Sequence, residues 1–498
     1  MSSNLGDAVP SARIKFPSFD LSSALEADHR ARMAAEDAGE PLDDEEVEFE
    51  GEEADGEADG EACAEPPPPI DPPCRSPSIS RKDKKYAKLT KRLRAKRAAE
   101  AVERIATRSI KPFVVELAKG AAPLQLEEFD ASSLPVSSSG WNANPRKKLS
   151  PGLQRVWKDL EVLSTTKGLK LLRWDGESCV VLVDARDRII AVLGGVPRGS
   201  KGTEWQAVEA EAAAAATRCR ESSTFTEAQK HGRRGEFASR TVGFGYGNGR
   251  CKPQNYKVSG RANQCAMQEL LQNTAVRRIA GFQNTLFNTY CHKNYAESRA
   301  TNEEIQRKQP ELRPNFPNTA FAATTFNLGP RSFSPPHMDP ENRASSWCAD
   351  TNMGPFNPDK GGHLVLWDLG LIVRFPPGST ILFPSALITH STIPIQAHES
   401  RYAIIQYSSG GLFRWRDNGF QSDKSFLGKA TAEERAEREA SRASRWKLGL
   451  QRFTRWADVC RGDWRGMIRT AAGLDEVSDL SELEESPVLR PSKRARCR

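Results

Sequence analysis

The sequence lacks the features of membrane and secreted proteins. No stretch of its 498 residues approaches the roughly 18 consecutive apolar residues that a membrane-spanning helix needs, and Met1–Asn4 does not open a secretory signal. The ten cysteines form no framework of close pairs, which is typical of a reducing compartment. Only 38% of the residues are hydrophobic, so part of the chain cannot bury enough apolar surface to fold. We therefore expect no membrane partner and one large folded region with tails.

Basic residues are absent from one long stretch. Residues 36–65 hold 16 acids and no base, although the whole chain has a net charge of +7. The remainder of the chain therefore carries a net charge of +23. A basic surplus of this size favours a polyanionic partner such as nucleic acid, and a generically soluble basic protein is the alternative.

Composition divides the chain into four parts. Residues 1–110 join the acidic block to a proline-rich stretch and to a basic segment, 81–108, and we expect them to be disordered. Residues 111–315 form an α+β part, 316–470 a β core with C-terminal helices, and 471–498 a disordered tail with a basic end. Basic clusters near both ends predict a nuclear protein, and a solvated charged helix is the alternative for the first cluster.

The α+β part begins with short apolar runs that predict strands near 169–174, 180–183 and 189–193. An Ala- and Glu-rich stretch predicts a helix over 204–218, and apolar residues spaced by three or four predict one long helix from 263 to 290. The glycine-rich segment from Gly243 to Gly249 is not a phosphate-binding motif, and we expect a flexible loop there.

After Pro317 short β-rich runs follow one another with no helices between them. They cover 321–328, 363–369, 381–383, 387–395 and 402–407, and turn residues separate them. This spacing predicts an antiparallel barrel or jelly roll. The fold class that we expect is α+β, with a double-stranded β-helix (jelly-roll) core flanked by helices.

His337, Asp339 and His390 form the sharpest chemical pattern. A non-haem Fe(II) oxygenase needs two imidazoles and one carboxylate on one face of the metal, with other positions open. A His-x-Asp pair at a strand end supplies two such ligands, and His390 lies in an apolar run, LFPSALITHSTIPI, where an imidazole needs a partner. A hydrogen-bonded core histidine is the alternative for His390.

Arg401 adds a second constraint. If the strands around His390 and Arg401 form a hairpin centred near 397–398, His390 pairs with about Ile405 and Arg401 lies four residues along the same face, about 13 Å away. That span suits one dicarboxylate that chelates iron at one end and pairs with the guanidinium at the other. The four positions together predict a site for Fe(II), 2-oxoglutarate and O2, and an exposed arginine on a barrel rim is the alternative.

At these residues the sequence resembles a known family. The stretches HMDPEN, GGHLVLWDLG, RFPPGSTILFPSALITHSTIPI and RYAIIQYSSGGLFRWRDNGF are similar to the TET/JBP-type 2-oxoglutarate dioxygenases, and most similar to the branch found beside transposable elements in mushroom-forming fungi. The resemblance covers about 317–420 and extends more loosely from about 112, so 111–315 would be the N-terminal part of the catalytic region. Family members oxidise the methyl group of 5-methylcytosine, or of thymine, with the base flipped into the barrel.

The resemblance assigns further residues. His337, Asp339 and His390 match the iron ligands, and Arg401 matches the arginine that holds the distal carboxylate of 2-oxoglutarate. Three more positions match family residues: Asn342 a contact to the target base, His363 a histidine near the cosubstrate, and Tyr407 a ring that stacks on the base. A turn cap, an exposed strand end and core packing are the respective alternatives.

Two positions depart from the family pattern. Ala403 lacks the hydroxyl that many members direct at the cosubstrate, and Ser409 replaces a base-contacting histidine of the animal enzymes.

The combined expectation is a nuclear dioxygenase that oxidises 5-methylcytosine in DNA to 5-hydroxymethylcytosine or further. Basic residues such as Arg445 and Lys447 would bind phosphate. The first alternative is the same chemistry on N6-methyladenine, thymine, RNA or protein. The second is a non-catalytic DNA-binding protein of a mobile element.

Overall fold

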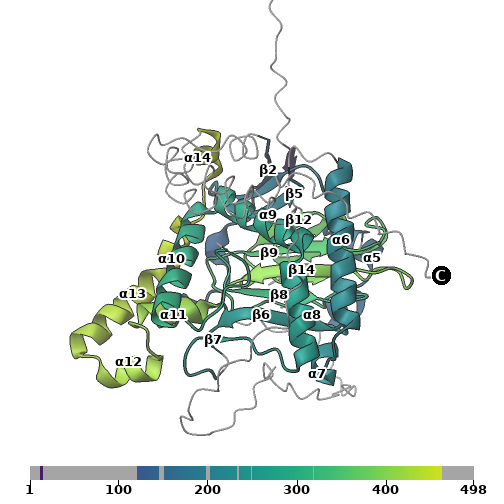
Figure 1. Cartoon of the computed structure of the whole chain (residues 1–498). Helices are drawn as coiled ribbons and strands as arrows, with labels where there is room; N and C mark the ends of the chain where they lie inside the picture. The colour runs from purple at the N-terminus through teal and green to yellow at the C-terminus, as the bar shows by residue number, and fades with distance from the viewer. Residues whose placement is uncertain are drawn as a thin grey trace, which may run out of the picture.

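The computed structural model describes residues 12–14, 120–144, 151–165, 167–197, 202–232, 235–247, 249–317 and 319–461. The basic segment 81–108 and the tail 471–498 lie outside the described residues, as does nearly all of 1–110. The described part of the chain is α+β, with two β-sheets and a layer of helices (Figure 1). Within it, no helix combines the length and the apolar character that crossing a bilayer requires.

Ten strands form the larger sheet, in the order β1-β2-β4-β5-β12-β9-β14-β8-β6-β7. Their bounds in chain order are β1 (Ala12–Ile14), β2 (Ala122–Leu126), β4 (Val180–Asp184), β5 (Ile189–Gly195), β6 (Ser239–Gly245), β7 (Gln254–Asn255), β8 (Ala323–Asn327), β9 (Cys348–Met353), β12 (Thr380–Phe383) and β14 (Tyr402–Tyr407). Strands β9 and β14, which come from distant parts of the chain, are antiparallel neighbours at its centre. Strands from both sides of residue 316 pair in this sheet, since β6 lies beside β8.

Four strands form the smaller sheet, in the order β13-β10-β11-β3. Their bounds are β3 (Lys170–Leu172), β10 (Leu364–Leu366), β11 (Leu371–Val373) and β13 (His390–Thr392). A single 3-10 turn, η2 (Trp367–Leu369), joins β10 to β11 and ends at Gly370, whose φ of 60° suits glycine. This hairpin places β13 at one edge of the sheet, beside β10.

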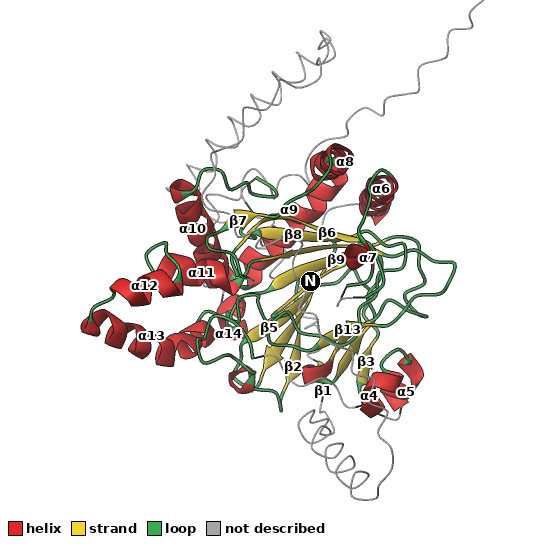
Figure 2. Ribbon diagram, turned by 90° about the horizontal axis from the view of Figure 1, so that it is seen from below, coloured by secondary structure: helices red, strands yellow, loops and turns green. Residues whose placement is uncertain are grey.

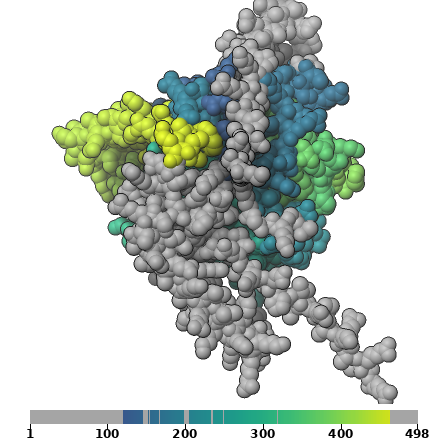
Figure 3. Space-filling view, turned by 90° about the horizontal axis from the view of Figure 1, so that it is seen from above, coloured from purple at the N-terminus to yellow at the C-terminus, as the bar shows by residue number. Residues whose placement is uncertain are grey.

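Helices cover one face of the larger sheet. The helices, with one further 3-10 turn, are η1 (Ala131–Ser133), α4 (Pro151–Val156), α5 (Leu160–Thr165), α6 (Gly202–Glu221), α7 (Glu227–Lys230), α8 (Arg261–Gln272), α9 (Thr274–Tyr290), α10 (His292–Lys308), α11 (Gly410–Asp417), α12 (Asp423–Lys429), α13 (Ala432–Gln451) and α14 (Trp456–Cys460). Figure 2 shows α6 and α8 on the side of the larger sheet away from β3 and β13. The segment that holds α12 and α13, coloured yellow-green in Figure 3, projects from the body.

Alternation along the central strands separates two hydrophobic cores. On β4, Val181 and Val183 pack with the helices, whereas Leu182 packs into the core between the sheets. Leu364 and Val373 of the smaller sheet lie in that second core, so the inner faces of the two sheets meet there. Full burial of one Val or Leu side chain contributes roughly 1.5–3 kcal/mol to the stability of the fold. The residues of the two cores together therefore hold the helices and the two sheets against one another.

The predicted helix over 263–290 is two helices. Asn273 has an extended backbone, with φ −60° and ψ 128°, and ends α8. Its side chain accepts hydrogen bonds from the amides of Ala275 and Val276 at 2.9 and 3.2 Å, and so caps α9. The apolar spacing is continuous across this break, which is why the sequence pattern missed it.

The glycine-rich segment was predicted to be a loop, and this is wrong for its first half. Gly243 and Gly245 belong to β6, because Gly243 pairs with Ala323 of β8 and Gly245 with Gln254 of β7. A Cβ on Gly243 would lie 2.2 Å from a backbone oxygen, so the strand needs glycine at this contact.

Candidate metal centre

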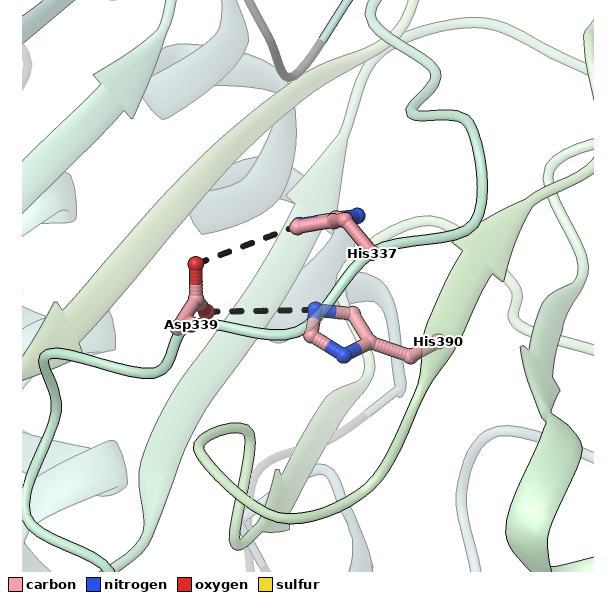
Figure 4. Close-up of side chains that lie close together, drawn as sticks. All are labelled: His337, Asp339 and His390. Atoms are coloured by element: carbon pink, nitrogen blue, oxygen red, sulfur yellow. Dashed lines mark ion pairs between the residues drawn. The ribbon is translucent and has the colours of Figure 1, made fainter. Parts of the chain in front are cut away.

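Three side chains from two separate segments converge between the sheets. His337 and Asp339 lie on the segment between β8 and β9, and His390 begins β13. One nitrogen of each imidazole and one carboxylate oxygen all lie within 4.8 Å of one another. Figure 4 shows the carboxylate of Asp339 facing both imidazoles. In the described part of the chain this is the one group of three such side chains that could hold a metal ion.

Backbone pairing brings the two histidines together. The amide of His337 donates to the carbonyl of His390 at 3.0 Å, and the amide of His390 donates to the carbonyl of His337 at 2.9 Å. The imidazole centroids are consequently 4.2 Å apart. The main chain thus sets this proximity before any side-chain interaction is considered.

Each imidazole is oriented through its Nδ1 atom. Nδ1 of His337 lies 2.8 Å from the carbonyl oxygen of Pro335, and Nδ1 of His390 lies 2.9 Å from that of Ile388. A carbonyl accepts, so each Nδ1 donates, which leaves Nε2 as the ring nitrogen available to a metal ion. The Nε2 atoms face the Asp339 oxygens at 4.0 and 3.9 Å. Two imidazoles and a carboxylate fit a divalent transition metal, and the two carbonyls orient the rings as the outer partners of such ligands do.

Arg401 is buried beside the segment that carries His337 and Asp339, where its backbone pairs with Pro330 and Ser332. It lies immediately before β14, and its Nη1 donates to the carbonyl of Ser332 at 3.0 Å. Among the described residues its Nε and Nη2 atoms have no hydrogen-bond partner, although the residue is only 2% exposed. Burial lowers the pKa of this guanidinium. Arginine nevertheless stays protonated in proteins. A buried cation with two unused donors is suited to an anionic ligand.

The predicted hairpin between His390 and Arg401 is wrong. His390 lies on β13, which pairs with β10 in the smaller sheet, whereas β14 pairs with β8 and β9 in the larger sheet. The turn residues at 396–399 therefore connect the two sheets, and do not close a hairpin within one of them.

Asn342 lies close to the metal ligands. Its Nδ2 donates to Ser385 Oγ at 3.1 Å, and the carbonyl of Ser385 accepts from the amide of Asp339 at 3.0 Å. Its own amide donates to the carbonyl of Asp339 at 2.9 Å, as in a turn. Asn342 also forms a backbone bridge with Ser409, whose hydroxyl accepts from the amide of Tyr246 at 3.3 Å.

A salt-bridge cluster holds the next residue of this segment. Arg343 is 2% exposed, and its guanidinium pairs with Glu297 of α10 at 2.6 Å and lies 3.9 Å from the ring centroid of Phe413. Arg452 pairs with the same Glu297 at 2.7 Å. The segment that carries Asp339 and Asn342 is thus tied to the helices outside the sheet.

Tyr407 faces the core between the sheets. Its hydroxyl lies 3.1 Å from Thr325 Oγ1, which lies 2.8 Å from Thr241 Oγ1 on the next strand. The tyrosine is 8% exposed and belongs to the same core cluster as Met338, which lies between His337 and Asp339. It therefore packs in the core beside the segment of the candidate centre.

His363 is buried just before β10 and is not an exposed strand end. It is 2% exposed, and burial lowers its pKa to about 4, helped by the positive charge of Arg374. The imidazole is therefore neutral at neutral pH. The structure does not bring it into the group formed by His337, Asp339 and His390.

Asp350 is a site residue that sequence reasoning missed. It lies on β9 opposite Ile405 and Ile381, which both pack into the core between the sheets, so its carboxyl group shares that inner face. Burial raises its pKa to about 6; the charge of Arg401 lowers this pKa and that of Asp339 raises it. No sequence signal pointed to it, because β9 was not among the predicted strands.

Ala403 is flanked by two amides. In register, Asn327 of β8 and Asn352 of β9 lie on either side of it. The Nδ2 of Asn352 donates to the carbonyl of Phe375 at 2.7 Å. Position 403 thus has polar neighbours on both adjacent strands, and Ala403 offers them no hydroxyl.

Arg445 was expected to bind phosphate, but its guanidinium is engaged within the protein. It lies 4.4 Å from the ring centroid of Trp141 and donates to the carbonyl of Ser139. Gly140 has a φ of 70°, and a Cβ there would lie 2.9 Å from the Arg445 side chain, so glycine permits the contact. Lys447 is exposed on α13, and phosphate binding there stays a prediction.

Comparison with known proteins returned little. The chain matches no protein-family model and no curated protein. One solved structure that matches is NgTET1 in complex with 5mC DNA, with 15% identity, a TM-score of 0.31 and coverage of 51% of this chain and 90% of that chain. The geometry of the site, rather than this likeness, carries the proposal below.

Proposed function

We propose that this protein is a 2-oxoglutarate- and Fe(II)-dependent dioxygenase that oxidises 5-methylcytosine in DNA. The observation that carries the proposal is the convergence of His337, Asp339 and His390, two imidazoles and a carboxylate, between two facing β-sheets. This donor set fits Fe(II) and leaves coordination positions for a cosubstrate and O2. In this proposal the two sheets form the double-stranded β-helix of a TET/JBP-type enzyme.

Four residues would bind the metal and the cosubstrate. His337, Asp339 and His390 would hold the iron, and Arg401 would pair through its unused Nε and Nη2 donors with the distal carboxylate of 2-oxoglutarate. Bound Fe(II) with 2-oxoglutarate and O2 supplies the oxidising power needed to attack a methyl C–H bond. The core between the sheets excludes water from this reaction.

The substrate assignment rests on Asn342 and the resemblance of the surrounding segment. An amide both donates and accepts, which suits the edge of a cytosine that has been flipped out of the duplex. Asn342 lies within one hydrogen bond of Ser385 and next to the Asp339 turn, so a base that contacts it would lie beside the metal. Nuclear localisation belongs to the same proposal, because duplex DNA with methylated cytosine is the substrate.

Mass spectrometry of nucleosides tests the proposal directly. Full-length protein is incubated with Fe(II), 2-oxoglutarate and oligonucleotides that contain 5-methylcytosine or N6-methyladenine. We expect oxidised cytosine from the wild type, none from the His337→Ala/Asp339→Ala double variant, and wild-type activity from His398→Ala, which removes an exposed histidine outside the group.

The outcomes separate the alternatives. Oxidation of N6-methyladenine alone would support the dioxygenase chemistry and contradict 5-methylcytosine as the substrate. Failure to form succinate with either oligonucleotide would overturn the enzyme assignment and favour a non-catalytic DNA-binding protein.

A further inference from the structure

Ser385 holds the side chain of Asn342 by one atom of its amide group. Ser385 lies two residues after β12 and is 1% exposed. The Nδ2 atom of Asn342 donates to the hydroxyl oxygen of Ser385 at 3.1 Å. The main-chain carbonyl of Ser385 accepts from the amide of Asp339 at 3.0 Å. One residue thus holds both the proposed base contact and the segment of a proposed metal ligand.

The oxygen of the same amide group is unengaged. Among the described residues no donor reaches Oδ1 of Asn342, and this oxygen is not one of their fully buried polar atoms that lack a partner. It therefore retains contact with solvent. An amide that is held through one N–H offers a ligand its oxygen and its second N–H in a fixed order.

A hydroxyl both donates and accepts, so the orientation of the amide also depends on where the proton of Ser385 points. Cys348 of β9 lies opposite Phe383, two residues before Ser385. Burial raises the pKa of the Cys348 thiol, and hydrogen bonding by Ser385 lowers it. The hydroxyl proton is thus directed at the sulfur atom, and the hydroxyl oxygen is left to accept from Asn342.

This orientation matters because the two bases that carry a 5-methyl group have opposite edges. Cytosine has an amino donor at N4 and an acceptor at N3, whereas thymine has an acceptor at O4 and a donor at N3. The methyl group must face the metal in both, so neither base can turn over to exchange these positions. An amide of fixed orientation therefore matches one base and opposes the other, because a mismatched pair leaves desolvated polar atoms without partners.

We propose that Ser385 is the positioning residue that sets base selection, because it holds the amide of Asn342 in the one orientation that matches 5-methylcytosine and opposes thymine. This inference rests on the proposed function and narrows its substrate. Ser385 acts through Asn342. Its bond to Asp339 is made by the main chain, so removal of the hydroxyl leaves that bond in place.

Paired substrates measure base selection. Full-length protein with Fe(II) and 2-oxoglutarate is given duplexes that differ at one base pair, either 5-methylcytosine with guanine or thymine with adenine. Mass spectrometry of hydroxymethylcytosine and hydroxymethyluracil gives kcat/KM for each base. We expect Ser385→Ala to reduce the wild-type preference for 5-methylcytosine by about tenfold, since the amide is then free to turn over. The cost of extruding each base cancels, because ratios are compared between proteins on the same DNA.

Two further variants separate orientation from packing. In Ser385→Ala/Asn342→Asp the side chain at position 342 only accepts, so we expect the wild-type preference to return. Ser379→Ala removes a similarly buried hydroxyl at the other end of β12, where it donates to the carbonyl of Pro376 at 2.6 Å, and should keep the wild-type ratio. Ser385→Ala and Ser379→Ala should both bind Mn(II) as the wild type does.

An equal loss of activity on both bases in Ser385→Ala overturns this inference, because it assigns the hydroxyl a structural role. A Ser385→Ala/Asn342→Asp variant that keeps the reduced ratio overturns it as well. A wild type that oxidises thymine as efficiently as 5-methylcytosine defeats the inference and leaves the proposed chemistry standing. If the wild type oxidises neither base, the proposed function fails and this inference fails with it.

Discussion

At the scale of single residues, main-chain carbonyls define the chemistry of the candidate centre. The carbonyls of Pro335 and Ile388 orient both imidazoles through Nδ1, so the main chain sets which ring nitrogen faces Asp339. The contrast is His363, a third buried histidine whose Nδ1 has no hydrogen-bond partner among the described residues. Burial is the largest cause that lowers its pKa, and the charge of Arg374 lowers it further, so protonation of this imidazole requires acid.

Acid should destabilise the fold through His363. Its pKa in the folded protein is about 4, against an ordinary value of 6.5. Between these values the unfolded chain binds a proton that the folded protein does not, so the free energy of unfolding falls as pH falls, by about 3 kcal/mol in full. Urea denaturation between pH 4 and 7 measures this loss, which His363→Gln should reduce.

His398→Gln is the matched control, because His398 is exposed. It should retain the wild-type dependence on pH. A His363→Gln variant that loses stability in acid as steeply as the wild type would contradict the assignment.

At this scale the sequence predicted part of the site. His337 and Asp339 are two residues apart, and the apolar run around His390 indicated an imidazole that needs a partner, so their convergence was foreseeable. Asp350 was not, because the run CADTNM has neither apolar alternation nor a turn signal and its strand is defined only by its neighbours. The register of β9 against β12 and β14 depends on tertiary contacts, which the local sequence does not specify.

At the scale of elements, the turn at 396–399 shows why strand partners were harder to predict than strands. The runs at 387–395 and 402–407 each contain a strand, as expected, but the turn between them crosses from the smaller sheet to the larger one. Turn residues specify a reversal of the chain and carry no information about which sheet receives it. The location of Arg401 beside the site therefore depends on β14 pairing with β8 and β9.

The link between α10 and the site segment should dominate the stability of that region. Glu297→Gln leaves the buried guanidinium of Arg343 without its carboxylate, at a cost of about 3–5 kcal/mol in the free energy of unfolding. Chemical denaturation checks this value. The control on the same helix is Glu303→Gln, whose partner Arg299 is more exposed, and it should cost about 1 kcal/mol or less.

Equal losses from the two substitutions would mean that Arg343 finds another counter-charge. A larger loss from Glu297→Gln, together with weaker metal binding, is the expected pattern.

At the scale of the whole molecule, charge is unevenly distributed along the chain. Residues 36–65 contribute 16 negative charges, and the remainder carries a surplus of 23 positive charges. A polyanion such as DNA would therefore be repelled by residues 36–65 and attracted by the basic remainder of the chain. An acidic segment competes with phosphates for the same cationic groups, so it should weaken non-specific binding to nucleic acid.

Deletion of residues 36–65 should therefore tighten binding to duplex DNA and steepen its dependence on salt. Fluorescence anisotropy with one labelled duplex at two salt concentrations compares the deletion with the full chain. Substituting the same segment by a neutral Gly/Ser sequence of equal length controls for chain length. Identical affinities and salt slopes for all three proteins would show that the acidic residues do not compete with DNA.

The candidate ligands lie on one strand of the smaller sheet and on a connecting segment of the larger sheet. His390 belongs to the smaller one, whereas His337 and Asp339 lie on a segment that connects strands of the larger one. An ion coordinated by all three would act as a cross-link between layers, so its retention and the melting temperature of the protein would rise and fall together. A substitution that weakens packing in the core between the sheets, far from every ligand, would then release the ion although all three ligand side chains are unchanged.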